Sequence, residues 1–213
     1  MQIVTHGYNS HFFPCYIELS INRALFLLSH LLILFNVGCN STSDYETMLS
    51  RETAREDTIR TLFFNYELGM PRQAFYDSSR ALNLRGLVTN GPNNRYVQYK
   101  LPDKFPHKAT MLYYPDFGED QVTQMRIRFS YDAWAPWNRH LWADSLIFEV
   151  RKLMEKWYGE GFLIQDVNIP MVGPSHEFVK IEANRQITIQ RDSDREVLVK
   201  ITDLRSLLSR EDE

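Results

Sequence analysis

The fold class is decided by the stretch VTQMRIRF at residues 122–129. Three apolar side chains, at positions 125, 127 and 129, alternate there with Arg126 and Arg128. A period of two places successive side chains on opposite faces of a β-strand. The pattern therefore predicts a half-buried strand of an antiparallel sheet, with one face in the core and the other in water.

Further strand signals lie on both sides of this stretch. Segments rich in β-branched and aromatic residues are separated by loops rich in Pro, Gly, Asn and Asp. Residues 115–120 and 191–195 have the composition of hairpin turns between such segments. The predicted strands are 96–101, 109–114, 122–131, 162–169, 178–182, 186–191 and 196–203.

Helical spacing precedes the first group of strands. In residues 45–66, Ile59, Leu62, Phe63 and Tyr66 recur at the i, i+3, i+4, i+7 positions of one helix face. We therefore expect a helix that runs through this segment.

Two further helices are expected. Pro71 is well placed to begin a helix over residues 71–85, and Gly86 sits where a C-terminal cap belongs. Helical spacing returns at residues 141–158 and ends at Gly159. The expected fold is α+β, with helices packed on a curved antiparallel sheet.

The order of elements repeats along the chain. A helix followed by strands occurs at residues 71–131 and again at 137–203, which favours two tandem α-β-β-β units. Recurrence of this order by chance is the alternative. We expect an α+β domain at residues 45–205, with sub-units 45–133 and 134–205, followed by a charged tail at 206–213.

The N-terminal segment has the pattern of a lipoprotein signal. The apolar run at residues 24–35 has the length of a signal-peptide core, about 7–15 residues, whereas a spanning helix needs roughly 20. Gly38 and Cys39 follow it. We expect residues 1–38 to be removed, Cys39 to carry the lipid and residues 39–44 to form a tether. A membrane span or a buried helix of the domain are the alternatives.

Cysteine content and charge narrow the class of protein. Cys15 and Cys39 are the 2 cysteines of the sequence, so a mature domain beginning at Cys39 holds no disulfide, Cys-type zinc site or free nucleophilic thiol. The formal net charge of -3 gives no basic footprint for nucleic acid. The expected partners are a membrane, through the lipid, and a protein of the cell envelope.

Two short motifs carry a resemblance to known families. The Gly38-Cys39 site is similar to the lipobox of Bacteroidetes lipoproteins, although Asn36 departs from the aliphatic residue usual there. The motif LGMP at residues 68–71, with Phe75 after it, resembles envelope lipoproteins of the SmpA/OmlA type. Those share a fold with β-lactamase inhibitor protein. The resemblance implies a lipid-anchored, outer-membrane location and a binding surface rather than an active site.

No catalytic or metal motif stands out. His107, His140 and His176 have no spacing that places two on one helix face. Asp192 and Glu196 belong to an alternating acidic run that lacks the glycine of a calcium loop, so a solvated turn is the better interpretation. We expect no cofactor, no metal and no enzymatic activity, with an unrecognised hydrolase as the alternative.

One aromatic cluster is a candidate binding site. Tyr131, Trp134, Trp137 and Trp142 flank the junction of the two predicted units. Such residues dominate interface hot spots and stack on sugars, but they also fill seams between packed units. The sequence thus favours a non-catalytic protein-binding lipoprotein. A glycan- or peptidoglycan-binding module is the alternative, for which these four residues would be exposed.

Overall fold

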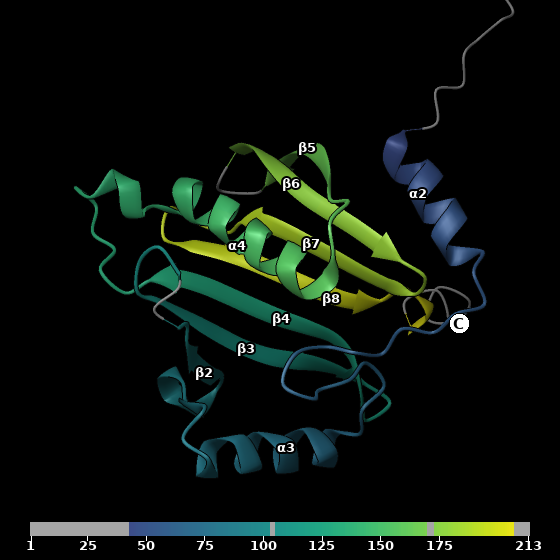
Figure 1. Ribbon diagram of the computed structural model, residues 1–213, viewed down its shortest axis with the longest axis horizontal. Coiled ribbons are helices and arrows are strands. Elements are labelled where there is room, and N and C mark those ends of the chain that lie inside the picture. Colours follow the sequence, from purple (N-terminus) through teal and green to yellow (C-terminus); the bar gives the residue numbers. More distant parts are fainter. Residues whose placement is uncertain (1–42, 103–104, 170–172, 207–213) are drawn as a thin grey trace, which may run out of the picture. The chain divides into compact units, whose positions relative to one another are not determined.

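The computed structural model describes residues 43–102, 105–169 and 173–206, which belong to a unit at Thr42–Glu213. The predicted signal, Cys39 and most of the tail lie outside the described residues. In the described part, eight strands form one antiparallel sheet in the order β1-β2-β3-β4-β8-β7-β6-β5 (Figure 1). The fold is α+β, as the sequence predicts.

The elements have the following bounds. The helices are α2 (Asp44–Thr53), α3 (Arg72–Leu84) and α4 (Ala143–Tyr158), with short 3-10 helices η1 (Pro92–Asn94) and η2 (Arg139–Leu141). The strands are β1 (Thr89–Asn90), β2 (Val97–Lys100), β3 (Ala109–Gly118), β4 (Gln121–Tyr131), β5 (Leu163–Ile169), β6 (Gly173–Glu182), β7 (Arg185–Arg191) and β8 (Glu196–Asp203).

Strand β4 lies near the middle of the sheet and confirms the predicted alternation. Its apolar side chains Met125, Ile127 and Phe129 are fully buried. Its other face carries Arg126 and Arg128, which are 57% and 34% exposed. The two faces of the sheet therefore have different roles, one in the core and one at the surface.

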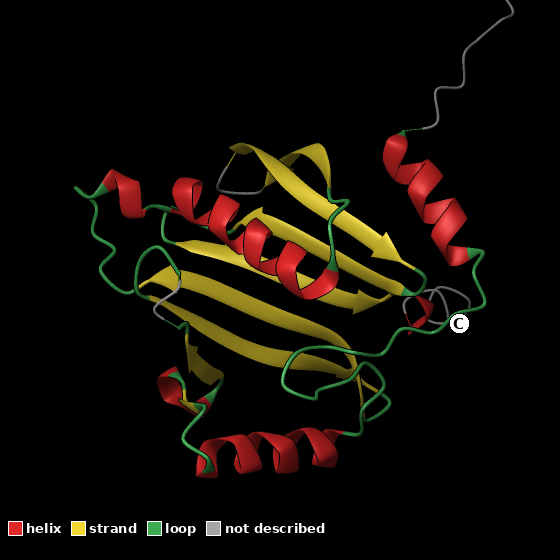
Figure 2. Cartoon of the chain, viewed as in Figure 1, coloured by secondary structure: helices red, strands yellow, loops and turns green. Residues whose placement is uncertain are grey.

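Helix α4 covers the buried face of the sheet. It contacts β4, β7 and β8, and lies over the sheet, roughly along the strand direction, in Figure 2. Its buried stripe, Leu146, Val150 and Met154, follows the period of a helix. At its end, Gly159 has φ +81°, a conformation that favours glycine.

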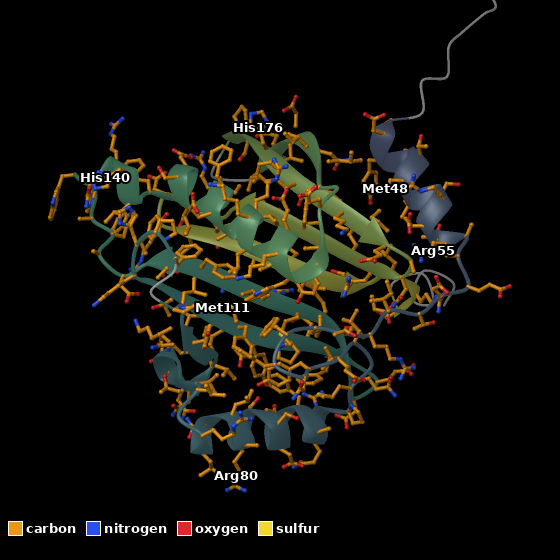
Figure 3. The ribbon with its side chains drawn as sticks, viewed as in Figure 1. Met48, Arg55, Arg80, Met111, His140 and His176 are labelled. Carbon is orange, nitrogen blue, oxygen red and sulfur yellow. The ribbon has the colours of Figure 1, made fainter. Side chains whose placement is uncertain are left out.

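Helix α2 packs on the opposite face, at one end of β6. Met48 joins Val179, Ile181 and Leu204 in a small apolar cluster (Figure 3). Phe178 precedes Val179 in β6, so its side chain points to the opposite face of the sheet and belongs to the core beneath α4. Strand β6 is thus covered on both faces, whereas β3 and β4 are covered mainly on one.

Helix α3 lies along β3, past the end of β2 (Figure 1). The ring of Phe75 contacts Tyr66, on the core side, and Tyr114, on the other side of the sheet. Phe75 is 1% exposed. This side chain therefore anchors α3 to the edge of the sheet.

The two halves of the chain share one sheet. Helix α3 precedes β1–β4 and helix α4 precedes β5–β8, so each half has four strands. The second half has the four strands expected at 162–203, whereas the first half has one more than the three expected, the short strand β1. The last strands of the halves, β4 and β8, pair with each other. The predicted sub-units at 45–133 and 134–205 therefore contribute to a common core.

The predicted helix at 45–66 is wrong beyond Thr53. The guanidinium of Arg205 donates to the backbone carbonyl of Asp57 at 2.9 Å, and Asn184 Oδ1 accepts from the backbone N–H of Ile59 at 2.7 Å. These contacts take backbone groups that a helix would bond internally. The periodic apolar residues are buried by tertiary packing instead.

The predicted turn at 115–120 is also too long. Strand β3 continues to Gly118, and the reversal is made by Glu119 and Asp120, which have φ of 49° and 64°. Strand β2 begins at Val97, opposite Tyr113, so Pro115 lies beyond the part of β3 that pairs with β2. Proline is tolerated on such an unpaired edge, where no strand needs its missing N–H. Among the described residues, no helix has the length and apolarity needed to span a membrane.

Candidate functional site

The predicted aromatic cluster does not form one exposed platform. Tyr131 ends β4 with 2% exposure, and its ring packs edge-on against His107. The indole N–H groups of Trp134 and Trp142 donate to the backbone carbonyls of Asp194 and Ala135, at 3.2 and 3.3 Å. Trp137 alone among the four is largely exposed, at 87%. Three of these side chains pack at the junction between the two halves.

A groove lies on the face of the sheet opposite α4. It has a volume of about 500 Å³, within the usual range of ligand sites, roughly 300–1,000 Å³. We call it the β3–β4 groove. Its lining consists of residues 94–96, alternate residues of β3 and alternate residues of β4, namely Leu112, Tyr114, Asp116, Arg126 and Arg128.

The groove follows the strand direction because its floor is made of alternate strand positions. Strand register places Leu112 opposite Arg128 and Tyr114 opposite Arg126, so these pairs share a face. The same alternation that buries Ile127 beneath α4 directs the arginines into the groove. One strand therefore builds both the core and the site.

The wall formed by residues 94–96 is held by tight local geometry. Gly91 donates its N–H to the carbonyl of Tyr96 at 2.8 Å. A Cβ at Gly91 would lie 3.0 Å from that same oxygen and 3.3 Å from Leu112 Cδ2. Asn93 and Asn94 both have φ of 54°, a region that Asn tolerates better than most residues.

A second hollow of about 290 Å³ adjoins the groove between α3 and β1–β2. We call it the α3 hollow; it shares residues 94–96 and Tyr114 with the groove and adds Tyr76, Ser79 and Arg80. Arg80 extends away from α3 toward solvent (Figure 3). The two hollows therefore share part of their lining on the same side of β3.

Ion pairs orient the arginines of the groove. Arg126 Nε lies 2.7 Å from Asp116 Oδ2. Arg128 donates through Nη1 to the Tyr96 hydroxyl at 3.0 Å, and its Nε lies 3.4 Å from Asp192 and 3.7 Å from Glu196. The predicted solvated turn at 191–195 thus supplies one of the carboxylates that fix Arg128.

The groove offers hydrogen-bond donors that keep their protons. Burial lowers the pKa of Arg128, but Asp192, Tyr96 and Glu196 outweigh it and raise the pKa overall. Burial, with help from the Tyr76 hydroxyl, raises the pKa of Tyr114 to about 12. These groups remain protonated at neutral pH, which suits them to bind acceptors and anions.

His107 and His140 lie close together, whereas His176 lies elsewhere in the structure. His140 on η2 and His176 on β6 lie at separate places in Figure 3. His176 Nδ1 lies 2.7 Å from Asp166 Oδ1, and the rings of His107 and His140 are 6.2 Å apart. In the described segments, no group of three or more His, Cys, Asp or Glu could hold a metal ion.

The sequence indicated part of this groove and missed the rest. The alternation in β4 showed that Arg126 and Arg128 face away from the core. The contribution of residues 94–96, and the register that sets Tyr114 opposite Arg126, depend on strand pairing that no local pattern specifies. The alternation of Leu112, Tyr114 and Asp116 in β3 was the sequence signal that these three side chains share one face of the sheet.

No protein-family model, curated protein or solved structure matches this chain. The resemblance to lipoproteins of the SmpA/OmlA type remains a prediction from the sequence.

Proposed function

We propose that the chain is a lipid-anchored protein of the cell envelope whose α+β domain is a non-catalytic binding module for a protein partner. The observation that carries this proposal is the β3–β4 groove on the open face of the sheet. Helix α4 closes the other face, so the open face is available for contact.

The composition of the groove supports binding rather than proton transfer. Tyrosine and arginine are the residues most enriched at interface hot spots, and both occur here at the floor and the walls. Tyr96 and Tyr114 bring rigid aromatic area, and the arginines bring directional donors. Among the aromatic residues predicted for a glycan site, Trp137 retains the exposure that stacking on a sugar needs.

The envelope location is supported by the sequence of the leader. The apolar run at 24–35 and Cys39 supply the pattern of a signal and a lipidation site. A tethered domain meets its partner at high effective concentration along the membrane surface.

Site-specific photo-crosslinking in intact bacterial cells tests the proposal. A benzophenone side chain at Leu112, on the groove floor, is expected to give a discrete protein adduct that mass spectrometry identifies. The matched control is Leu84 on α3, which is 81% exposed and lies outside the groove lining. Adducts from position 84 but none from position 112 would contradict the groove as the binding surface.

A further inference from the structure

We infer that the α3 hollow is a binding site for an acidic sugar, a hydroxylated ring that carries a carboxylate. The inference goes beyond the proposed function, because the hollow has walls of its own on α3 and β1. Its volume of about 290 Å³ is just below the range usual for ligand sites, roughly 300–1,000 Å³, which suits a small ligand.

The charged side chains of the hollow are two arginines without a counterion. Arg80 and Arg95 line it and no described carboxylate does, so the lining has a formal charge of +2 in a chain that carries -3. Neither arginine side chain makes an ion pair, a hydrogen bond or a ring contact with a described residue. In this they differ from Arg126 and Arg128 of the groove, which pair with carboxylates. Unpaired positive charge in a hollow attracts an anionic ligand.

The surroundings leave these two charges available to a ligand. Asp77, one turn before Arg80 on α3, does not line the hollow, and its carboxylate accepts from Gln73 Nε2 at 3.0 Å. Arg80 extends to solvent (Figure 3), so it borders the open side of the hollow. Arg95 belongs to a different element, the segment between η1 and β2. A bound carboxylate can therefore meet guanidinium groups from two elements.

The uncharged polar groups of the hollow favour a ligand with hydroxyls. Asn83 Nδ2 donates to the carbonyl of Val88 at 2.9 Å, which leaves Asn83 Oδ1 available to a donor. The side-chain amides of Asn90 and Asn94 have no partner among the described residues and offer both donors and acceptors. A simple anion only accepts, and the arginines repel an ammonium group. A hydroxyl both donates and accepts, so it suits these amides.

Aromatic rings provide the apolar surface on which a sugar ring packs. Tyr76 and Tyr114 line the hollow, and their hydroxyls lie 2.7 Å apart. Tyr96 lines it from the segment before β2, and its hydroxyl accepts from Arg128 at 3.0 Å. Rings that are already held in place lose little freedom when a ligand binds, and their faces can contact C–H groups. The hollow therefore combines rings for the face of a sugar, amides for its hydroxyls and guanidinium groups for its carboxylate.

NMR titration of the isotopically labelled full-length chain in detergent tests the inference. The probes are glucuronate, neutral glucose, acetate and inorganic phosphate. Glucuronate is expected to shift the side-chain amide signals of Asn90 and Asn94. It should bind about fivefold more tightly than any other probe, because only glucuronate meets both the arginines and the amides.

Arginine variants test recognition of the charge. Arg95→Gln should weaken glucuronate binding about two- to fivefold, as for a partly exposed ion pair, and reduce the preference over glucose. The matched control is Arg60→Gln. Arg60 is also exposed and has no side-chain partner among the described residues, but it does not line the hollow. Its replacement should leave the affinity unchanged.

Glycine variants test recognition of the hydroxyls. Asn94 has φ of 54°, which glycine adopts without strain, so Asn94→Gly removes the amide and keeps the backbone. It should weaken glucuronate binding about two- to fivefold, the effect of losing a typical hydrogen bond. The matched control is Asn93→Gly, since Asn93 has the same φ and does not line the hollow. This control should bind glucuronate as the natural chain does.

Several results would overturn the inference. Acetate or phosphate that binds as tightly as glucuronate would show an anion site without sugar recognition, and equally tight glucose would remove the role of the arginines. Binding that leaves the signals of Asn90 and Asn94 unshifted, or equal losses in a variant and its control, would place the ligand elsewhere. Photo-crosslinking at Leu112 reports on the groove alone, because Leu112 does not line the hollow, so the two tests are independent.

Discussion

The hydroxyls of Tyr76 and Tyr114 lie 2.7 Å apart and join α3 to β3 where the α3 hollow meets the β3–β4 groove. Tyr76 is 41% exposed, whereas burial of Tyr114 is the main cause of its raised pKa. The hydrogen bond therefore joins the more buried Tyr114 to a helix that lies outside the sheet.

Removing the Tyr76 hydroxyl tests this link. Tyr76→Phe should lower the free energy of unfolding by about 0.5–1.5 kcal/mol, since a typical hydrogen bond contributes that much. It should also lower the pKa of Tyr114, because the bond from Tyr76 raises it. Denaturant unfolding and the ultraviolet absorbance of tyrosinate measure the two effects. Tyr99→Phe, whose ring packs on Phe64, is the control; equal effects in both variants would contradict the role of Tyr76.

Stability should fall at alkaline pH. Burial, and then the charge of Glu149, raises the pKa of Tyr131 from 10.0 to about 12. Between these values the unfolded chain loses the tyrosine proton while the folded chain keeps it, so unfolding is favoured as pH rises. The stabilisation is fully present below pH 10.

Urea unfolding at about pH 9 and about pH 11 measures this loss, expected to be about 1.3 kcal/mol at most for Tyr131. In Tyr131→Phe the decline over that range should be smaller than in the natural chain. An identical decline would show that Tyr131 does not contribute.

Phe75 should be the most sensitive residue of α3. Phe75→Ala is expected to cost about 3–5 kcal/mol, as for other buried phenylalanines replaced by alanine. Because Phe75 anchors α3 against Tyr66 and Tyr114, the α3 hollow should open as well. Leu84→Ala on the same helix, at an 81% exposed position, should change stability by about 0.5 kcal/mol or less. Similar losses in the two variants, measured by chemical denaturation, would rule out this anchoring.

Cys39 should determine membrane attachment. Cys39→Ala is expected to abolish metabolic labelling with palmitate and to release the chain into the soluble fraction, because a lipidated cysteine is the proposed anchor. Cys15→Ala, within the predicted signal, should retain both properties. Membrane association that survives in Cys39→Ala would argue against the lipid anchor.

The sequence predicts local elements well where one face is buried in a regular way. The alternation at Met125, Ile127 and Phe129 was sufficient for β4, and Pro71 with Gly86 delimited α3 closely. The helical spacing of Leu62, Phe63 and Tyr66 was misleading, because a burial pattern does not reveal whether the backbone groups bond within the segment or with distant residues. Asn184 and Arg205 supply those distant partners.

The aromatic cluster shows a second limit. Trp134 and Trp142 look like surface binders by composition, yet their N–H groups donate to backbone carbonyls near the junction. By contrast, Phe148 fits a helical apolar pattern but is 55% exposed, since the buried face of α4 is set by Leu146, Val150 and Met154. Whether such residues are covered depends on the packing of distant strands.

The alternation of β4 separates two tasks by the parity of residue number. The side chains at odd positions from 125 to 129 are buried in the core, and those at 126 and 128 line the β3–β4 groove. Substitutions at even positions can therefore change the lining of the β3–β4 groove without repacking the interior. Insertion of one residue would exchange the two sets and bring guanidinium groups beneath α4. Variation compatible with folding should accordingly proceed by replacement in this strand and not by changes in its length.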